Sequence, residues 1–266
     1  MKDGSIKSRM GINGIRRIAS REFSEHGLER TLEDYGRPLF LMVSGAHNFG
    51  FPSVNSDVDI RGVYLAPTER FLGIREKAQE QSLNYMSSDR MLDVNVEEVG
   101  KYLMLIAKSN GNRLEWPNSD LLFRSSPEFE ELKKVVNVAG LSQKLLNHYL
   151  NFARDLFSGK TKASGVKRDL YTLRTYMTGI NILENGIIDS NISRLNELFG
   201  YEIVDTLIRK KQLNEWGDSS GYSQKELRMV VTELDKRLQQ SGKKSSLPEN
   251  PNTREINNYL CSLRSS

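Results

Sequence analysis

The spacing of apolar and polar positions divides the chain into a strand-rich front part and a helical rear part. Residues 39–43 are five consecutive apolar residues between a proline and a Ser-Gly pair, which is typical of a strand buried on both faces. Three further strands are predicted at 58–64, 82–86 and 91–96. After Pro127, apolar residues recur at spacings of three and four, which indicates amphipathic helices. These helices are predicted at 128–138, 141–158, 166–185, 191–199, 201–212 and 223–240.

Two more helices flank the predicted strands. Residues 11–35 predict one helix that ends at a Gly-Arg-Pro sequence, and 97–109 predict another. At the C-terminal end, 241–252 contains two lysines and two prolines and is predicted to be a flexible break. A last helix is predicted at 253–264.

Strands followed by helices predict an α+β fold with two unlike parts rather than a doubly wound sheet. The expected division is an N-terminal helix at 1–36, a small mixed-sheet catalytic domain at 37–116 and a helical domain at 117–266. The border between the last two is placed within 117–127.

Composition excludes several classes of protein. The chain has 266 residues, of which 38% are hydrophobic and 27% are charged, values typical of a globular domain in water. No apolar run approaches the roughly 18 residues of a membrane span, and the first residues lack the apolar core of a secretory signal. The single Cys261 and three scattered histidines exclude a disulfide framework and a zinc cluster. We therefore expect a cytoplasmic protein with no membrane partner.

Charge is distributed unevenly along the chain. Residues 1–138 carry 19 basic and 20 acidic side chains, whereas 139–266 carry 19 basic and 14 acidic ones, which together give the net charge of +4. A basic half favours a polyanionic partner such as a triphosphate or a nucleic acid. A solvated helical surface explains the same charge.

Two carboxylates stand two residues apart on a predicted strand, at Asp57 and Asp59. Alternate residues of a strand point to the same face, so these side chains repel one another unless a cation lies between them. Mg²⁺ prefers one or two carboxylates together with phosphate oxygens. The pair therefore predicts half of a metal site for phosphoryl or nucleotidyl transfer.

Small residues follow the first predicted strand at Gly45 and Ala46. A backbone that turns there without a bulky side chain exposes N–H groups to which phosphate oxygens can bind closely. The strand, the glycine turn, the gap of about ten residues and the Asp-x-Asp strand predict a phosphate site beside a metal pair.

This combination resembles the DNA polymerase β superfamily of nucleotidyltransferases. Gly45-Ala46-His47 followed by Ser56-Asp57-Val58-Asp59 and then Arg61-Gly62 is similar to the branch described as the RNA repair pathway DNA polymerase beta family. The similarity is strong over 38–65 and weaker over 93–115 and 167–186.

The resemblance implies a third carboxylate on a later strand. Asp93 is the candidate because 91–96 is strand-like, with Asp89, Glu97 and Glu98 as competitors; the last two also fit the N-terminus of a helix. Asp57, Asp59 and Asp93 would together hold Mg²⁺ or Mn²⁺, and Asp93 would accept the proton of the attacking hydroxyl.

The resemblance also implies nucleotide-binding residues. Its expected set is Gly45, Ala46, His47, Ser56, Arg61, Lys101 and Arg174. Two of these have alternatives: His47 either orients a phosphate or bonds to the loop backbone, and Arg61 either contacts phosphate or neutralises the aspartates. In the predicted helix at 166–185, Lys167, Tyr171, Arg174 and Thr178 form a stripe of positive charge and hydroxyls that suits a triphosphate or an acceptor strand.

One residue departs from the family pattern. Ala46 stands where the family usually has serine, whose hydroxyl helps to hold the terminal phosphates of the nucleotide. Ser44 and Asn48 are neighbouring groups that can replace this donor.

The expected function is transfer of a nucleoside monophosphate from an NTP to a hydroxyl acceptor, with an RNA 3′ end as the first choice. One alternative is transfer to a protein or small-molecule hydroxyl. Another is an inactive module that binds nucleotide or RNA, although three retained carboxylates argue against it. Neither the base of the NTP, the use of a template nor the oligomeric state follows from the sequence.

Overall fold

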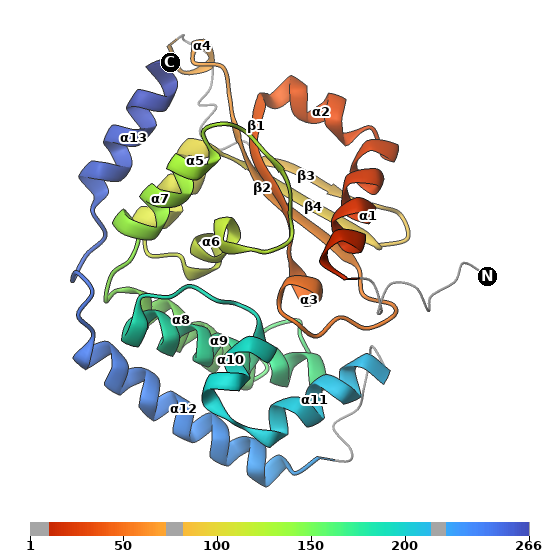
Figure 1. Cartoon of the computed structure of the whole chain (residues 1–266), viewed down its shortest axis with the longest axis vertical. Helices are drawn as coiled ribbons and strands as arrows, with labels where there is room; N and C mark the ends of the chain where they lie inside the picture. Colours follow the sequence, from red (N-terminus) through yellow and green to blue (C-terminus); the bar gives the residue numbers. More distant parts are fainter. Residues whose placement is uncertain (1–10, 73–81, 214–221, 266) are drawn as a thin grey trace. The chain divides into compact units, whose positions relative to one another are not determined.

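A computed structural model describes residues 11–72, 82–213 and 222–265, and its five described strands form one mixed sheet (Figure 1). The order in the sheet is β3-β4-β2-β1-β5. Strands β2 and β4 are parallel, while the other neighbours are antiparallel. The strands are β1 (Arg37–Val43), β2 (Val58–Leu65), β3 (Ser82–Met86), β4 (Leu92–Glu98) and β5 (Leu122–Ser125). The expected α+β fold with a mixed sheet is confirmed.

Helices cover both faces of this sheet (Figure 1). On one face, Ile18 and Leu32 belong to the same core as Ile60 and Val94 of the sheet. On the other face, Phe40 has its ring 6.1 Å from that of Tyr102 and 5.3 Å from that of Phe129. The first face carries α1 (Ile12–Glu25) and α2 (Leu28–Tyr35); the other carries α5 (Val99–Ala107) and α7 (Phe129–Ala139), beside which lies α13 (Thr253–Ser265).

The expectation of a single helix over 11–35 is wrong. Gly27 adopts a left-handed conformation, with φ of 67°, and separates α1 from α2. Glycine adopts this conformation without the steric cost that other residues incur. The turn lets Phe23 of α1 and Leu32 of α2 both enter the core.

Several short elements escaped prediction. Strand β5 lies inside 117–127, where the sequence suggested a domain border, and it pairs with β1 at the edge of the sheet. Its two apolar residues are only half-buried and the next two are exposed, so they show no alternating pattern. The other short elements are α3 (Gly45–Asn48), α4 (Glu69–Leu72), α6 (Gly111–Glu115) and the 3₁₀ turn Trp116–Asn118.

The helices predicted for the rear part form around one central member. Helix α9 is buried along most of its length from Val166 to Leu183, because α8, α10, α11 and α12 all pack on it. The five are α8 (Leu145–Phe157), α9 (Gly165–Asn185), α10 (Ile192–Phe199), α11 (Glu202–Leu213) and α12 (Gln224–Lys244).

Helix α12 runs past residue 240, where the sequence predicted it to end. The hydroxyl of Ser241 donates to Glu184 over 2.6 Å, and Gly242 packs against Leu146. These contacts continue the helix to Lys244, so the predicted break is shorter and begins at Ser245.

The described residues form two compact units that interleave along the chain. The helical unit contains 46–56 and 142–250, and the sheet unit contains 11–45, 57–141 and 251–265. Helix α7 therefore belongs to the sheet unit, as does the C-terminal helix α13. The three-part division at residues 36 and 116 stays a prediction. No described helix combines the length and the apolar character needed to cross a membrane.

Candidate active site

Two aspartates face one another at the start of the parallel strand pair. The register of β2 and β4 places Asp59 opposite Asp93. Both are half-buried, whereas Val58, Ile60 and Val94 point into the core on the other face. Because side chains alternate across a strand, the two carboxylates share the face opposite that core.

Arg61 lies between these two carboxylates. Its Nη2 donates to Asp59 Oδ1 over 3.0 Å and to Asp93 Oδ2 over 2.7 Å. Its Nη1 donates to the backbone carbonyls of Asp93 and Ile60. A single guanidinium thus offsets two like charges that would otherwise repel, and the contact of Arg61 with phosphate stays a prediction.

The glycine turn after β1 lies directly against Asp59. Gly45 has φ of 65°, and a Cβ atom there would stand 1.9 Å from Asp59 Oδ2. The amide of Ser44 donates to the carbonyl of Asp59 over 2.7 Å, which joins the end of β1 to β2. Both the left-handed backbone and the close approach require glycine.

Asp57 immediately precedes β2 and is half-buried. In the part of the chain that the structure describes, it forms no ion pair. Nor do any three histidine, cysteine or acidic side chains of the described residues form a group that would hold a metal ion.

The competing acidic residues have structural partners. Glu98 caps α5 by accepting from the amide of Gly100 over 2.6 Å, and it pairs with Arg264 over 2.9 Å. Burial raises the pKa of Glu98, and Arg264 opposes that shift. Glu97 pairs with Arg113 over 2.6 Å. The helix-start interpretation of Glu98 is thus confirmed.

Asp89 also has a local role, in the turn between β3 and β4. It accepts from the Ser87 hydroxyl and from the Met91 amide, and these bonds lower its pKa. Among the acidic residues considered for the third carboxylate, Asp93 is the one that the structure brings to Asp59.

The segment 46–56, which connects Gly45 to Asp57 along the chain, packs within the helical unit. The guanidinium carbon of Arg174 stands 4.1 Å from the ring centroid of Phe49. The amide of Ile192 donates to the carbonyl of Phe49 over 2.9 Å, and Asn48 donates to the Ser190 hydroxyl over 3.0 Å. The side-chain amide of Asn48 thus donates a hydrogen bond within the helical unit.

A second buried cation supports the same segment, and sequence reasoning missed it. Lys211 has no exposed surface, and its Nζ lies 3.4 Å from Ser53 Oγ. The Ser53 amide in turn donates to Ser56 Oγ over 2.9 Å. Lys211 stands in a basic triplet that resembled a solvated surface. The available signal was its helical spacing from the buried Val204 and Leu207.

The stripe predicted on α9 is not one open face. Arg174 and Thr178 are buried, and the Thr178 hydroxyl donates to the carbonyl of Asp189. Lys167 and Tyr171 border a cavity that lies in the helical unit.

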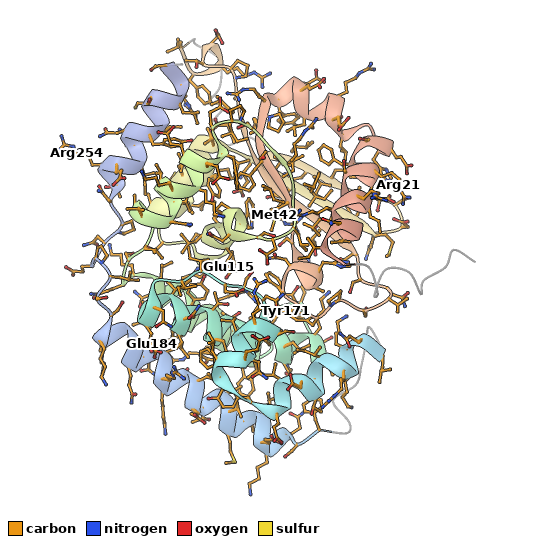
Figure 2. All side chains as sticks on the ribbon, in the orientation of Figure 1. Arg21, Met42, Glu115, Tyr171, Glu184 and Arg254 are labelled. Atoms are coloured by element: carbon orange, nitrogen blue, oxygen red, sulfur yellow. The ribbon has the colours of Figure 1, made fainter. Side chains whose placement is uncertain are left out.

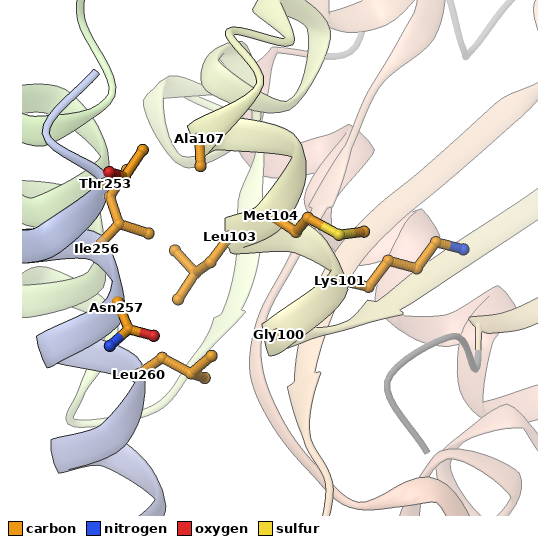
Figure 3. A pocket seen from close by; sticks show the side chains of 9 residues that line it. All are labelled: Gly100, Lys101, Leu103, Met104, Ala107, Thr253, Ile256, Asn257 and Leu260. Carbon is orange, nitrogen blue, oxygen red and sulfur yellow. The ribbon is translucent and has the colours of Figure 1, made fainter. Parts of the chain in front are cut away.

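The remaining predicted residues fall in different places. Ala46 is buried and His47 half-buried, both on the short helix α3. The structure does not bring Lys101 to the aspartates: its Nζ donates to Ser82 Oγ at the Glu97 end of the β3–β4 pair, whereas Asp93 is at the other end. Figure 3 shows Lys101 on α5, beside a groove of about 370 Å³ between α5 and α13, with its side chain directed away from α13.

A mixed sheet that holds a glycine turn against one of two paired strand carboxylates is the arrangement expected from the resemblance to polymerase β-like nucleotidyltransferases. The model of the RNA repair pathway DNA polymerase beta family matches residues 15–262. The chain belongs to this family.

Relatives of similar length match over most of the chain. It is 31% identical over 220 residues to the uncharacterized protein MJ0002 of Methanocaldococcus jannaschii, which covers 80% of this chain and 88% of that protein. It is 28% identical over 246 residues to the uncharacterized protein YcgL of Bacillus subtilis, covering 88% and 92%. A solved structure, the nucleotidyltransferase-like protein from Exiguobacterium sibiricum, matches 86% of this chain and 77% of its own with 14% identity and a TM-score of 0.30.

Proposed function

We propose that this nucleotidyltransferase moves a nucleoside monophosphate from an NTP to the 3′ hydroxyl of RNA, which forms a phosphodiester bond and releases pyrophosphate. One observation carries the proposal: Asp59 and Asp93, opposite one another on parallel strands, share a single arginine and lie beside the turn at Gly45. Two carboxylates with one guanidinium retain a net negative charge, which suits a further cation.

The chemistry of this donor set suits a hard divalent ion, although the described residues do not arrange it as a group of three metal ligands. Asp57, Asp59 and Asp93 would hold Mg²⁺ or Mn²⁺, since these ions prefer carboxylate and phosphate oxygens. When bound, such an ion offsets the charge that develops on phosphate oxygens and makes an attacking hydroxyl more acidic.

The protein's own residues have separable roles in this proposal. Gly45 lets the Asp59 carboxylate lie directly against the turn, because a Cβ atom there would stand 1.9 Å from Asp59 Oδ2. Asp93 accepts the proton of the attacking hydroxyl. Arg61 holds the two aspartates in register before substrate binds.

RNA is the proposed acceptor for two reasons. The family that the chain belongs to is described as an RNA repair pathway family. The stretch 139–266 has five more basic than acidic residues, and such an excess strengthens binding to a polyanion.

The test is label transfer with each α-³²P-labelled NTP, Mg²⁺ or Mn²⁺, and RNA that ends in either a 3′ hydroxyl or a 3′ phosphate. We expect label only in the hydroxyl-ended RNA. The variant Asp57→Asn/Asp59→Asn should abolish transfer, and Asp34→Asn, at an exposed acid on α2, should leave it unchanged. Label in protein, or equal transfer by the double variant, would contradict the proposal.

A further inference from the structure

A cavity of about 410 Å³ lies in the helical unit beside the start of α9. Helix α8 supplies Phe152 and Leu156 to its wall, the following segment supplies Thr161 and Lys162, and α9 supplies Lys167 and Tyr171. Figure 2 labels Tyr171 on this helix. The volume is within the range of small-ligand sites.

The two lysines give the cavity a positive charge. Within the described residues, neither Lys162 nor Lys167 forms an ion pair. Their basic neighbours differ: Lys160 pairs with Asp155 over 3.1 Å, and Arg168 pairs with the buried Asp169 over 2.9 Å. The lysines that line the cavity are therefore the ones whose charge is left for a ligand.

The start of α9 lacks the groups that usually stabilise a helix N-terminus. The side chain of Ser164, the N-cap residue, makes no capping hydrogen bond, and the first turn holds no acidic residue. Lys167 stands there instead, although the helix dipole favours negative charge at this end. A bound anion would accept hydrogen bonds from the uncapped backbone amides and would offset the positive charge of Lys167.

A polar group beside the same cavity has no partner. Thr161 Oγ1 is buried and has no hydrogen-bond partner among the described residues. A buried hydroxyl without a partner is costly. Because this oxygen is closed to water, a ligand in the cavity would satisfy it only after the Thr161 side chain turns.

Aromatic side chains complete the wall. The ring of Tyr171 meets those of Phe49 and Phe51 edge-on, at 5.5 and 5.4 Å, and these contacts fix its position. Phe152 contributes a second ring to the lining. Aromatic rings beside lysines match the base and phosphate of an unpaired nucleotide.

We propose that this cavity binds one nucleotide of a single-stranded RNA, with the base against Tyr171 and Phe152 and the phosphate between Lys162, Lys167 and the start of α9. The inference rests on the proposed function, for which it supplies the site that recognises the acceptor. Tyr171 packs on the segment 46–56, which leads directly into Asp57, so this site is linked to the catalytic residues through the chain.

The test is fluorescence anisotropy with a labelled single-stranded oligoribonucleotide of about 12 nucleotides. We expect Lys162→Gln/Lys167→Gln to raise Kd about tenfold or more. The salt dependence should fall by about 0.7 in slope, because the contact with one phosphate is lost. The control Lys236→Gln/Lys243→Gln, at two exposed lysines of α12, should stay within twofold of the wild type.

A second variant separates binding from folding. Ser164→Asp adds an acidic N-cap, which should stabilise α9 and raise Tm. The same carboxylate repels phosphate, so Kd for the oligonucleotide should rise severalfold. A variant that is more stable and yet binds less RNA is the outcome that a merely structural role of this cavity does not produce.

Three results would overturn the inference: equal affinity of the cavity double variant and its control, unchanged affinity of Ser164→Asp, or equally tight binding of a blunt RNA duplex. The variant Asp57→Asn/Asp59→Asn should bind the oligonucleotide like the wild type. If binding behaves as expected while no NTP gives label transfer, the proposed function fails and the inferred RNA site stands.

Discussion

Strand β4 carries acidic residues at both ends. The residues at the two ends differ in how many arginines they pair with and in their exposure to solvent. At its far end, Glu97 and Glu98 each have an arginine of their own, and their side chains are 2% and 0% exposed. At its start, Asp93 shares Arg61 with Asp59, and the two carboxylate side chains are 31% and 17% exposed.

We interpret this difference as one between structural charges and the charges of the proposed catalytic site. A one-to-one buried pair is neutral, and it can stay out of water because each group satisfies the other. Two carboxylates on one arginine keep a net negative charge within reach of solvent. A net negative charge of this kind suits the binding of a positively charged ligand. The number of arginines per carboxylate and the exposure to solvent therefore distinguish the two ends of β4, although both carry acidic residues.

Substitution at each end should therefore have opposite consequences. Asp59→Asn should lower nucleotidyl transfer by about 10³-fold, the size typical of removing an electrostatic group from a catalytic site, with little change in Tm. Glu98→Gln should leave Arg264 buried without its counter-charge. That loss costs about 3–5 kcal/mol, or roughly 10 °C in Tm.

Transfer assays and thermal melts on both variants measure the contrast. If Asp59→Asn lowers Tm as much as Glu98→Gln does, the two ends of β4 do not differ in kind.

The turn beside Asp59 offers a gain of function. Ala46→Ser restores the hydroxyl that the family usually has, and a hydrogen bond to a charged phosphate is worth about 1.5–3 kcal/mol. NTP affinity should tighten about ten- to a hundredfold, as measured by calorimetry with Mg²⁺ and a non-hydrolysable NTP. Thr232→Ala, which removes an exposed hydroxyl of α12, serves as the control. An unchanged Kd would mean that phosphate does not reach residue 46.

Removing the shared arginine should sharpen the electrostatic contrast. Arg61→Gln leaves Asp59 and Asp93 without a counter-charge, so Mg²⁺ should bind about tenfold more tightly and add about 1.4 kcal/mol to the stabilisation that this ion gives. The measurement is Tm as a function of Mg²⁺ concentration. Arg113→Gln, at the other end of β4, should show the wild-type Mg²⁺ response. A parallel response of the two variants would show that Arg61 does not compete with cations.

A pair nearer the surface gives the smallest effect. Arg37 donates two hydrogen bonds to Glu128 and lowers the pKa of this glutamate from 4.5 to about 2. A lowered pKa stabilises the fold above pH 4.5, and this contribution is lost as pH falls from 4.5 to 2.

Glu128→Gln should therefore flatten the fall in the free energy of unfolding over that pH window. The change at pH 7 should be less than about 1 kcal/mol, because the Arg37 side chain is 48% exposed and water screens the pair. Denaturant melts at a series of pH values measure it, with Glu130→Gln, an exposed acid in the first turn of α7, as the control. An identical pH profile for Glu128→Gln and wild type would contradict the assignment.

Local pattern was enough to predict most of the elements. The apolar run at residues 39–43 and the alternation around Asp57 and Asp59 predicted β1 and β2, because burial on one or both faces leaves a direct mark on sequence. Strand β5 left no such mark, since an edge strand with half-buried side chains is held by backbone hydrogen bonds to β1. The turn at Gly27 depends on one backbone conformation, which a helical pattern of side chains conceals.

The charge arrangement of the site needed the three-dimensional register. The sequence placed Asp57 and Asp59 together because they are neighbours on one strand. That Arg61 joins Asp59 to Asp93 follows from the parallel pairing of β2 with β4, strands separated in the chain by β3. Long-range pairing of this kind has no local signature, and the burial of Lys211 in a basic triplet has only a weak one.

The assignment of residues 46–56 to the helical unit has a consequence for how the two units can be exchanged between genes. This segment belongs to the helical unit, although both of its ends continue into the sheet unit, and 251–265 returns to the sheet unit at the C-terminus. No single cut in the chain separates the two units, so one crossover cannot exchange either of them as a whole. A gene that acquired a new helical unit by one crossover would lose the support for the residues between Gly45 and Asp57.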